Sequence, residues 1–344
     1  MNVSIIGATG YGGGELFRLL YHHPVFNIHS IHTTRDEKPF SDEWSHLTGI
    51  TDIRLEKIDP EKISKNSDIV FIAAPSGVSG KIVRDFIDKG VQIIDLSGDL
   101  RLMDQEQYRQ WYKHEPVERS LLDKAVYGLS EWNRENIANA SLIANPGCYS
   151  TATLLGLAPV VKEQIIDPSM IIVDAKSGAS GAGRSAAKNL LYSEINENFS
   201  IYKVNKHQHI PEIEQQLLEW NGAMAPISFN THLLPITRGI MATIYVKLSK
   251  DISSEGIIEL YKETYKDSQF VKIRPIGNFP SIKEVSGTNY CDIGIHVDER
   301  TGRLTIVSVI DNLIKGAAGQ AIQNANIMNG LDESTGLHFV PSFP

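Results

Sequence analysis

The sequence has little cysteine, no run of basic residues and no long apolar segment. Its 344 residues contain 2 cysteines, Cys148 and Cys291, which cannot build a disulfide framework, so a reducing, cytoplasmic setting is expected. The formal net charge of -8 and the lack of any Lys/Arg-rich stretch argue against nucleic acid or an anionic membrane as the main partner. No segment approaches the roughly 18 apolar residues of a membrane helix, and the first residues do not read as a signal peptide. No His, Cys and Asp cluster has ligand spacing, so no metal is expected.

The overall amino-acid composition is typical of a folded globular protein. Hydrophobic residues make up 42% of the chain and charged residues 22%. A chain of this length is expected to form one or two domains, each large enough to bury a core.

A glycine-rich loop near the N-terminus lies between a predicted strand at residues 3–6 and a predicted helix at 15–20. Residues 7–14 read GATGYGGG. Glycines at 7, 10 and 13 form a GxxGxxG variant of the dinucleotide fingerprint, in which small residues permit a tight turn and close approach of a pyrophosphate. The alternative is a glycine-rich turn without a ligand. The residues expected to contact a dinucleotide here are Gly7, Thr9, Gly10, Tyr11, Gly12 and Gly13.

The end of a second predicted strand, residues 28–32, indicates which dinucleotide is bound. An NAD site needs a carboxylate at this point for the ribose 2′-hydroxyl. Here Thr34 and Arg35 come before Asp36. Hydroxyls and an arginine suit a 2′-phosphate, so the sequence favours NADP, with a solvated loop charge as the alternative role of Arg35.

Strands and helices then alternate. Apolar strands are predicted at residues 68–74 and 91–96, with a helix at 78–88 between them. This alternation predicts an α/β fold with a doubly wound parallel sheet. Ligands bind beyond the carboxyl ends of such strands, so Ser76 is expected to contact the cofactor, and the loop at residues 97–99 and Cys148 are expected to face the same crevice.

Residues 144–152, ANPGCYSTA, carry the candidate nucleophile. Pro146 and Gly147 end a short apolar strand, and a helix with an apolar face follows, so Cys148 lies at a strand-to-helix turn near the helix N-terminus. Unpaired N–H groups and the positive end of the helix dipole favour a thiolate there. The alternative is a buried, inert cysteine.

A second small-residue loop, residues 176–184 with the sequence KSGASGAGR, follows a predicted strand at 170–175 and precedes a predicted helix from Ser185. Such a loop is expected to leave backbone N–H groups available to an anion; a flexible surface loop is the alternative. Gly178 and Ala179 are predicted to contact the cofactor, and Ser177 and Arg184 the substrate.

Two histidines precede a predicted helix that starts near Pro211. With a candidate thiolate elsewhere in the chain, His209 is the first candidate for general acid/base catalysis and His207 the second, with a substrate-binding role as its other possibility. Arg238 is either a clamp for a carboxylate or phosphate or a surface charge.

The C-terminal third predicts a strand at residues 240–248, a helix at 254–265 and a hairpin of 292–297 with 303–310. These long strands predict a second, mixed or antiparallel sheet, whose exposed face would suit self-association. A helix over 311–321 would start at Asn312, which is either a nicotinamide contact or an N-cap.

Several of these stretches together resemble the N-acetyl-gamma-glutamyl-phosphate reductase family of arginine biosynthesis, over essentially the full length. The stretches that carry the resemblance are residues 7–13, DLSGDLR at 95–101, YGL at 127–129, NPGCY at 145–149, SGASGAGR at 177–184, HQHIPEI at 207–213 and KGAAGQA at 315–321.

The resemblance implies an NADP-binding Rossmann domain of residues 1–147 plus 312–344, and an α+β catalytic and oligomerisation domain of residues 148–311. It implies a homo-oligomer, a tetramer or dimer, that reduces an anionic acyl phosphate. Cys148 would be the nucleophile and His209 the base. Arg184, Arg238 and Arg101 are candidates for holding the substrate.

Four other interpretations stay open. Aspartyl phosphate or a carrier-bound aminoadipate phosphate would use the same chemistry. Tyr202 and Lys206 spell the YxxxK motif of short-chain reductases and epimerases, although Val204 and Asn205 are poor helix formers. A non-enzymatic NADP sensor would use the first half of the chain alone.

Overall fold

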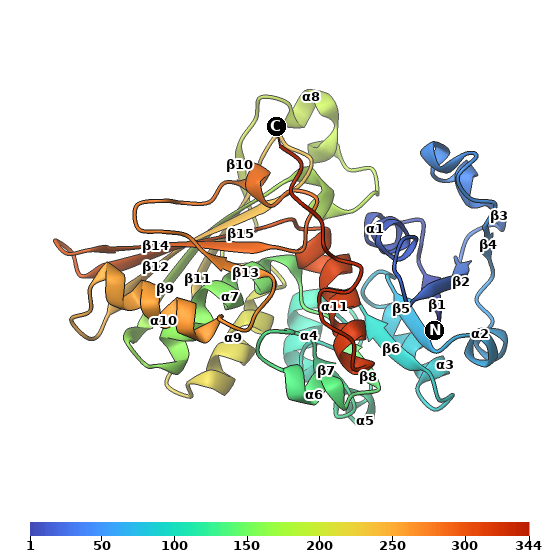
Figure 1. Cartoon of the computed structure of the whole chain (residues 1–344), viewed down its shortest axis with the longest axis horizontal. Helices are drawn as coiled ribbons and strands as arrows, with labels where there is room; N and C mark the ends of the chain where they lie inside the picture. The colour runs from blue at the N-terminus through green and yellow to red at the C-terminus, as the bar shows by residue number, and fades with distance from the viewer. Residues whose placement is uncertain (344) are drawn as a thin grey trace. The chain divides into compact units, whose positions relative to one another are not determined.

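The computed structural model describes residues 1–343, which group into two compact units (Figure 1). Unit 1 comprises Met1–Pro146 and Ala317–His338, and unit 2 comprises Gly147–Gly316 and the residues from Phe339 onward. Each unit is built on a β-sheet of its own.

Unit 1 contains a sheet of 8 strands whose neighbours run parallel, except for the antiparallel pair β3 and β4 at one edge. The order across the sheet is β3 (Lys38–Pro39), β4 (Arg54–Glu56), β2 (Asn27–His32), β1 (Asn2–Ile6), β5 (Ile69–Ile72), β6 (Gln92–Asp95), β8 (Leu142–Ala144) and β7 (Val126–Tyr127). Every residue of β5 is buried, as expected for a parallel strand covered on both faces. The predicted doubly wound α/β fold is confirmed.

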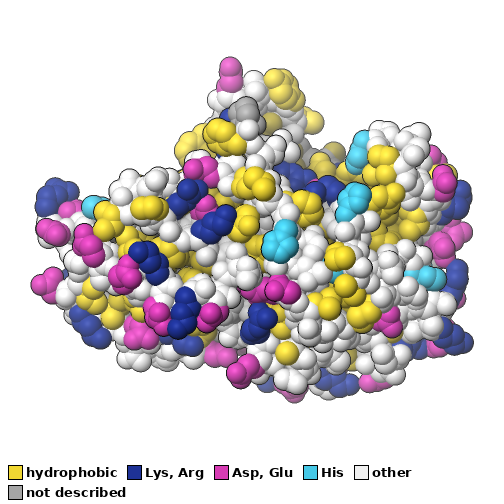
Figure 2. Space-filling view, in the orientation of Figure 1, with side chains coloured by type: hydrophobic (Ala, Val, Ile, Leu, Met, Phe, Trp, Pro, Cys, Tyr) yellow, Lys and Arg dark blue, Asp and Glu magenta, His cyan; other side chains and the backbone are white. Residues whose placement is uncertain are grey.

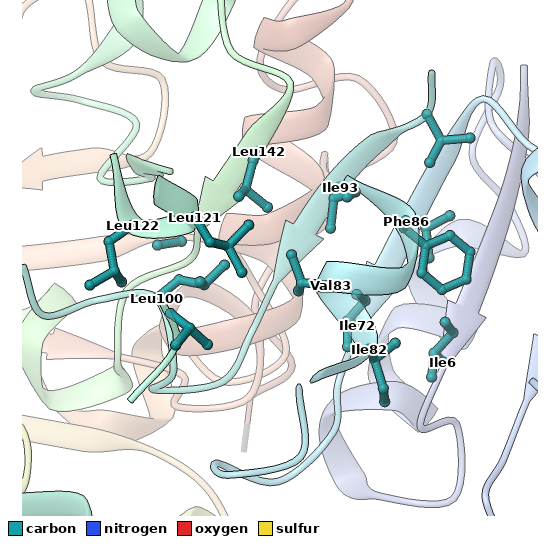
Figure 3. Close-up of a cluster of buried hydrophobic side chains, with 14 of the residues drawn as sticks. Ile6, Ile72, Ile82, Val83, Phe86, Ile93, Leu100, Leu121, Leu122 and Leu142 are labelled. Atoms are coloured by element: carbon teal, nitrogen blue, oxygen red, sulfur yellow. The ribbon is translucent and has the colours of Figure 1, made fainter. Parts of the chain in front are cut away.

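Helices connect these strands and build the core of unit 1. They are α1 (Tyr11–Leu20), α2 (Pro60–Asn66), α3 (Ser79–Phe86), α4 (Gln105–Tyr112), α5 (Arg119–Leu122), α6 (Arg134–Ala138) and α11 (Gly319–Met328). Figure 3 shows apolar side chains of β1, β5, β6 and β8 gathered with those of α3 and α5 in one buried cluster. Its labelled members are Ile6, Ile72, Ile82, Val83, Phe86, Ile93, Leu100, Leu121, Leu122 and Leu142. Burial of this cluster holds the carboxyl ends of the parallel strands in fixed positions.

Unit 2 contains a mixed sheet of 7 strands. The order is β10 (Ser200–Tyr202), β11 (Ser228–Leu233), β9 (Ile166–Ser177), β12 (Ile240–Leu248), β15 (Arg303–Ile310), β14 (Cys291–Asp298) and β13 (Val271–Ile273). Most neighbours are antiparallel, whereas β11 pairs with β9 and β13 with β14 in parallel. The predicted mixed sheet and the β14–β15 hairpin are confirmed.

One face of this second sheet is covered by α7 (Cys148–Lys162), which is buried all round from Tyr149 to Val161. The other helices of unit 2 are α8 (Tyr192–Ile195), α9 (Ile210–Trp220) and α10 (Ser254–Thr264). On the opposite face, Val285 packs on Val307 and Val309, while Ile172 and Tyr245 are exposed. A helix that is apolar on every side belongs in a core, so α7 gives its first residue a rigid base.

Two predicted helices are wrong in position. The segment from Ser185 has no α-helix until the single turn of α8, because its residues are exposed and have no apolar face to bury. The helix predicted over 311–321 begins with a π-helical turn at Ile314–Ala318 and becomes α-helical at Gly319.

Charged side chains of both signs are interspersed on the face shown in Figure 2. Among residues 1–343, no helix combines the length and the apolar character needed to cross a bilayer.

Candidate active site

The glycine loop of unit 1 connects β1 to the start of α1. Gly7 has φ +90°, and a Cβ there would lie 2.5 Å from the Ala73 carbonyl oxygen. A Cβ on Gly13 would lie 2.4 Å from the Gly7 carbonyl oxygen. The fold itself therefore requires glycine at both positions, because backbone atoms occupy the space of any side chain.

Gly10 and Gly12, unlike Gly7 and Gly13, have room for a side chain. The nearest atom to a Cβ on Gly10 is 3.7 Å away, and a Cβ on Gly12 would have no neighbour within 4 Å. Gly10 is the N-cap of α1 without a side-chain cap, and the first bond of the helix runs from the Gly14 N–H to the Gly10 carbonyl. The N–H groups of residues 11–13 thus have no acceptor inside the helix. Open space before a helix N-terminus fits a pyrophosphate.

The segment after β2 is exposed and holds Thr34 and Arg35. The Arg35 N–H donates to the Thr33 hydroxyl at 3.1 Å. Arg35 makes no ion pair with any residue in the described range 1–343. Its guanidinium is therefore available to an anion.

Ser76 and Arg101 lie on the loops that follow β5 and β6. The Ser76 hydroxyl accepts the Gly98 N–H at 3.1 Å, and Asp99 accepts the Gly77 N–H at 2.8 Å, so these two loops are joined. Arg101 is buried, and its Nε and Nη2 donate to the carbonyls of Asn145 and Leu96, both at 2.8 Å. Arg101 thus supports the ends of β6 and β8.

Asp95 closes β6 as a fully buried carboxyl group. Its oxygens accept from the Ser79 hydroxyl and from the N–H and hydroxyl of Ser97. Burial is the largest influence and raises the pKa of Asp95 to about 6, against the lowering effect of these hydrogen bonds.

Cys148 is the first residue of α7, directly after the extended N-cap Gly147. The thiol is partly exposed, whereas Cys291 is buried. A Cβ on Gly316 would lie 2.7 Å from the Cβ of Cys148, so only glycine fits beside the thiol-bearing residue. The cysteine therefore stands at the positive end of a rigid helix with one side still accessible.

The two histidines lie at the start of α9, whose N-cap is His209. Both are buried, and their ring centroids are 4.7 Å apart. The Tyr149 ring packs edge-on against both, at 5.1 Å from His207 and 6.1 Å from His209. Tyr149 is the neighbour of Cys148, so the starts of α7 and α9 bring the cysteine segment and the histidine pair into one region of unit 2.

His207 is held as a neutral imidazole. Burial, with smaller contributions from His209 and Lys203, lowers its pKa to about 2. Its Nδ1 lies 3.2 Å from the backbone N–H of His209 and must accept from it, which leaves the ring proton on Nε2. His207 therefore offers a fixed N–H and no exchangeable charge near neutral pH.

Glu212 was missed by the sequence analysis. It is fully buried in the first turn of α9, and its Oε1 accepts the Gly147 N–H at 2.8 Å. It thereby fixes the residue before Cys148. In sequence, an acid at this position looks like an ordinary residue of a helix start, so no local pattern distinguished it.

The YxxxK interpretation is wrong. Tyr202 ends β10, and Lys203 and Asn205 have φ of +47° and +49° in a turn, so Tyr202 and Lys206 do not share a helix. The Tyr202 hydroxyl instead lies 2.9 Å from that of Tyr149. Burial raises the pKa of both phenols, which keeps them protonated.

The expectation that the loop at 176–184 leaves its backbone N–H groups free is wrong for Gly178, Ala179 and Ser180. The N–H groups of Gly178, Ala179 and Ser180 donate to the carbonyls of Gly239, Ile236 and Thr237 at 2.9, 2.9 and 3.0 Å. A Cβ on Gly178 would lie 2.7 Å from the Thr237 carbonyl oxygen. The small residues here serve close packing of two chain segments, so these N–H groups are not available to an anion.

The remaining candidates of unit 2 lie around this loop. The Ser177 hydroxyl donates to the Gly178 carbonyl at 3.0 Å, and Arg184 is exposed. Arg238 Nη1 lies 3.6 Å from the buried Asp311 carboxylate, which anchors its guanidinium. Asn312 is not the predicted N-cap, because the Asp311 Oδ1 accepts the N–H groups at 313 and 314.

Asn312 has its side chain engaged within unit 2. It accepts the Gly239 N–H at 2.7 Å and donates to the Ser180 hydroxyl at 3.0 Å. No group of three metal-ligating side chains occurs among the residues that the structure describes.

Models of two known domains match the chain. The semialdehyde dehydrogenase NAD-binding domain matches residues 2–140, and the semialdehyde dehydrogenase dimerisation domain matches residues 148–312. Curated relatives match over the whole length. The N-acetyl-gamma-glutamyl-phosphate reductase of Geobacillus sp. (strain WCH70) is 57% identical and that of Bacillus subtilis (strain 168) 52% identical, each over 100% of both chains.

Solved structures share the fold at low sequence identity. Aspartate semialdehyde dehydrogenase II from Vibrio cholerae has a TM-score of 0.72 and 19% identity over 96% of this chain and 98% of that chain. The aspartate semialdehyde dehydrogenase with NADP from Candida albicans has a TM-score of 0.71 and 18% identity over 95% and 98%.

Proposed function

The chain belongs to the N-acetyl-gamma-glutamyl-phosphate reductase family, and we propose from that premise that it reduces N-acetyl-L-glutamyl 5-phosphate to N-acetyl-L-glutamate 5-semialdehyde with NADPH, releasing phosphate, in arginine biosynthesis. The observation that carries the chemistry is the partly exposed Cys148 at the first position of a buried helix, beside the segment of the histidine pair.

Unit 1 would hold the cofactor. The open N–H groups at residues 11–13 suit the pyrophosphate, and Thr34 and Arg35 suit the 2′-phosphate. Ser76 lies on a neighbouring loop at the carboxyl edge of the sheet. Bound NADPH supplies the hydride for the reduction.

Cys148 would act as the nucleophile. Its thiolate attacks the carbonyl carbon of the acyl phosphate, the C–O bond to phosphate breaks, and the acyl group remains as a thioester on Sγ. Sulfur donates poorly to the carbonyl, which therefore stays open to hydride. The thiohemiacetal formed by reduction then releases the aldehyde and restores the thiolate.

His209 would move the proton. It protonates the oxygen of the thiohemiacetal and takes that proton back when the C–S bond breaks. The low pKa of His207 supports His209 in this role, because the His207 ring does not take up a second proton near neutral pH. The fixed Nε2–H of His207 is suited to hold the substrate.

The substrate carries negative charge on its phosphate and its carboxylate. Arg238, Arg184 and Ser177 in unit 2 are candidates for holding these groups, and Arg238 is the best positioned because Asp311 anchors it. Arg101 is the third candidate, and two of its donors already hold backbone carbonyls at the strand ends of unit 1.

Comparison of substrates with Cys148→Ala tests the proposal. The wild-type protein is expected to reduce N-acetylglutamyl phosphate, and Cys148→Ala to lose at least about three orders of magnitude in kcat. Cys291→Ser is the matched control, because that thiol is buried on β14, where its Sγ lies 3.3 Å from the Ser308 hydroxyl. Equal or better turnover of aspartyl phosphate, or of carrier-bound aminoadipate phosphate, would reassign the substrate. Cofactor binding without turnover of any of the three would favour the sensor.

Unit 2 would also mediate self-association, as a homodimer or a tetramer of two dimers. The matching model is a dimerisation domain, and the sheet face opposite α7 exposes Ile172 and Tyr245 in directly paired positions. Tyr245→Glu is expected to lower the mass measured by light scattering, whereas Tyr192→Glu, outside the sheet, is not. The cytoplasm is the proposed location, because the 2 cysteines are free.

A further inference from the structure

Lys57 lies at the same sheet edge as the segment expected to select the cofactor. It directly follows β4, whose last residue Glu56 pairs with His32, the last residue of β2. The Thr33 N–H donates to the Glu56 carbonyl at 3.0 Å, which keeps the two strand ends together. Because dinucleotides bind beyond the carboxyl ends of such strands, Lys57 flanks the place of the adenosine ribose.

Lys57 contacts the segment after β2 with both its backbone and its side chain. The Lys57 Nζ donates to the Arg35 carbonyl at 2.8 Å, and the Lys57 N–H donates to the Glu37 Oε1 at 3.1 Å. The ammonium is thus held at the backbone of Arg35, the residue that supplies the guanidinium. Two of its three N–H donors remain after this bond.

A buried hydrogen-bond chain fixes Lys57 from the inside. His32 is buried, and burial lowers its pKa, so the ring is neutral. Its Nδ1 must donate to the Lys57 carbonyl at 3.0 Å, and its Nε2 then accepts from the Ser30 hydroxyl at 2.8 Å. Ser30 continues to Ser4 at 2.7 Å. The backbone of Lys57 is therefore held by buried side chains of the sheet.

The charge of Lys57 is not neutralised. Neighbouring lysines are paired, Lys38 with Glu43 at 2.6 Å and Lys62 with Glu56 at 2.7 Å. Lys57 makes no ion pair with any residue of the described range 1–343, and its ammonium contacts a neutral carbonyl. The segment itself carries one cation, Arg35, against two acids, Asp36 and Glu37. Without Lys57, the balance of charge there would repel a phosphate.

We propose that Lys57 is a specificity-determining residue that binds the 2′-phosphate of NADP together with Arg35. Lysine supplies a point charge and Arg35 a planar fork, which together match the charge and shape of a phosphate monoester. The proposal rests on the proposed function in taking the glycine loop as the dinucleotide site. It extends that function by adding a residue that follows β4 to those that follow β2.

Titration calorimetry with 2′,5′-ADP and with ADP tests this without any acyl phosphate. Lys57→Gln is expected to weaken binding of 2′,5′-ADP about tenfold and to change ADP binding less than about twofold. Lys57→Arg keeps the charge and should retain most of the affinity. Lys65→Gln, an exposed lysine on α2 with the same change of charge, should have no effect on either ligand.

Equal weakening of both ligands, or no weakening, would overturn the proposal, because Lys57 would then only support the loop or do nothing. The melting temperature of Lys57→Gln checks that the fold is intact. A protein that binds 2′,5′-ADP through Lys57 but turns over no acyl phosphate would leave this inference standing while the proposed function fails. In an active enzyme, Lys57→Gln should lower kcat/KM with NADPH about tenfold and leave that with NADH unchanged.

Discussion

The two small-residue loops have similar compositions but are used in opposite ways. In unit 1, the loop at 7–14 leaves the N–H groups at 11–13 without an acceptor in the helix, and the space around Gly10 is open. In unit 2, the N–H groups of Gly178, Ala179 and Ser180 are consumed by neighbouring carbonyls. A glycine-rich loop is thus an anion site only where the rest of the fold leaves its donors free.

The same contrast extends to the chemistry of the two units. Unit 1 presents backbone donors and charges from strand ends, which suits binding of a dinucleotide. Unit 2 presents a thiol and imidazoles from the starts of two helices, which suits covalent catalysis. If this division is correct, substitutions in the site of unit 1 should change cofactor binding, and substitutions in the site of unit 2 should change turnover.

The largest expected effect separates the two histidines. His209→Asn should lower kcat by about 10²–10⁴-fold, because the proton donor is lost. It should also remove the limb of the pH–rate profile due to an imidazole. His207→Gln should keep that limb, since a group with a pKa of about 2 does not titrate in the working range. The measurement is kcat and kcat/KM from pH 5 to 9.

Binding of NADPH to both variants provides the control and should be unchanged. A profile that loses its limb in His207→Gln instead would exchange the two roles.

The next largest effect is expected from replacing one glycine of each loop by alanine, with NADPH affinity and stability measured for both variants. Gly10→Ala should weaken NADPH binding about 10–100-fold, because its methyl group would occupy the open space before α1. Its cost in stability should be about 0.5–1 kcal/mol, because alanine is less favourable than glycine at an N-cap, while the added Cβ meets no atom closer than 3.7 Å. Fluorescence titration and thermal unfolding measure the two quantities.

Gly178→Ala should show the reverse pattern. Its Cβ would meet the Thr237 carbonyl oxygen at 2.7 Å, so a loss of stability of about 1–3 kcal/mol is expected, with cofactor affinity retained. Weak NADPH binding in a stable Gly178→Ala variant would return this loop to the cofactor site.

The smallest expected effect is on the pH dependence of the free energy of unfolding, and it comes from Asp95. Its pKa is raised to about 6 in the folded protein from the ordinary 3.8, so the folded state binds a proton between these values while the unfolded state does not. Stability from this group therefore rises as pH falls from 7.5 to 5, by about 1 kcal/mol. Asp95→Asn should lack this contribution.

The test is the difference between the two proteins' free energies of unfolding in urea at both pH values. Lowered pKa values of His23 and His32 act in the opposite direction, but they are common to both proteins and cancel. A difference that does not change with pH would show that Asp95 is not a buried titrating group.

Much of the fold could be predicted because its signals are local. Strand β12 has the bounds predicted for it, residues 240–248. Helix α9 begins at Ile210, so Pro211 lies in its first turn as predicted. The helix expected from Ser185 failed because sequence propensity is weak without an apolar face to pack.

The candidate site was predictable only in part. A cysteine after Pro-Gly, followed by an apolar helix, has a local pattern. Glu212, by contrast, reaches Gly147 across 65 positions of sequence, and Lys57 reaches Arg35 across 22. No spacing rule connects residues that meet through the packing of helices or the register of strands.

The sequence by itself determined the two-sheet architecture, the glycine loop and the placement of Cys148 at a helix start, because each depends on neighbours within a few residues. Only the tertiary structure decided which backbone N–H groups have no acceptor within the protein, and that the ring of His207 is neutral. It also decided that the ammonium of Lys57 forms no ion pair with a carboxylate of the described residues. Those properties depend on burial and on partners from distant segments, since desolvation and hydrogen bonding act on whatever the fold brings together.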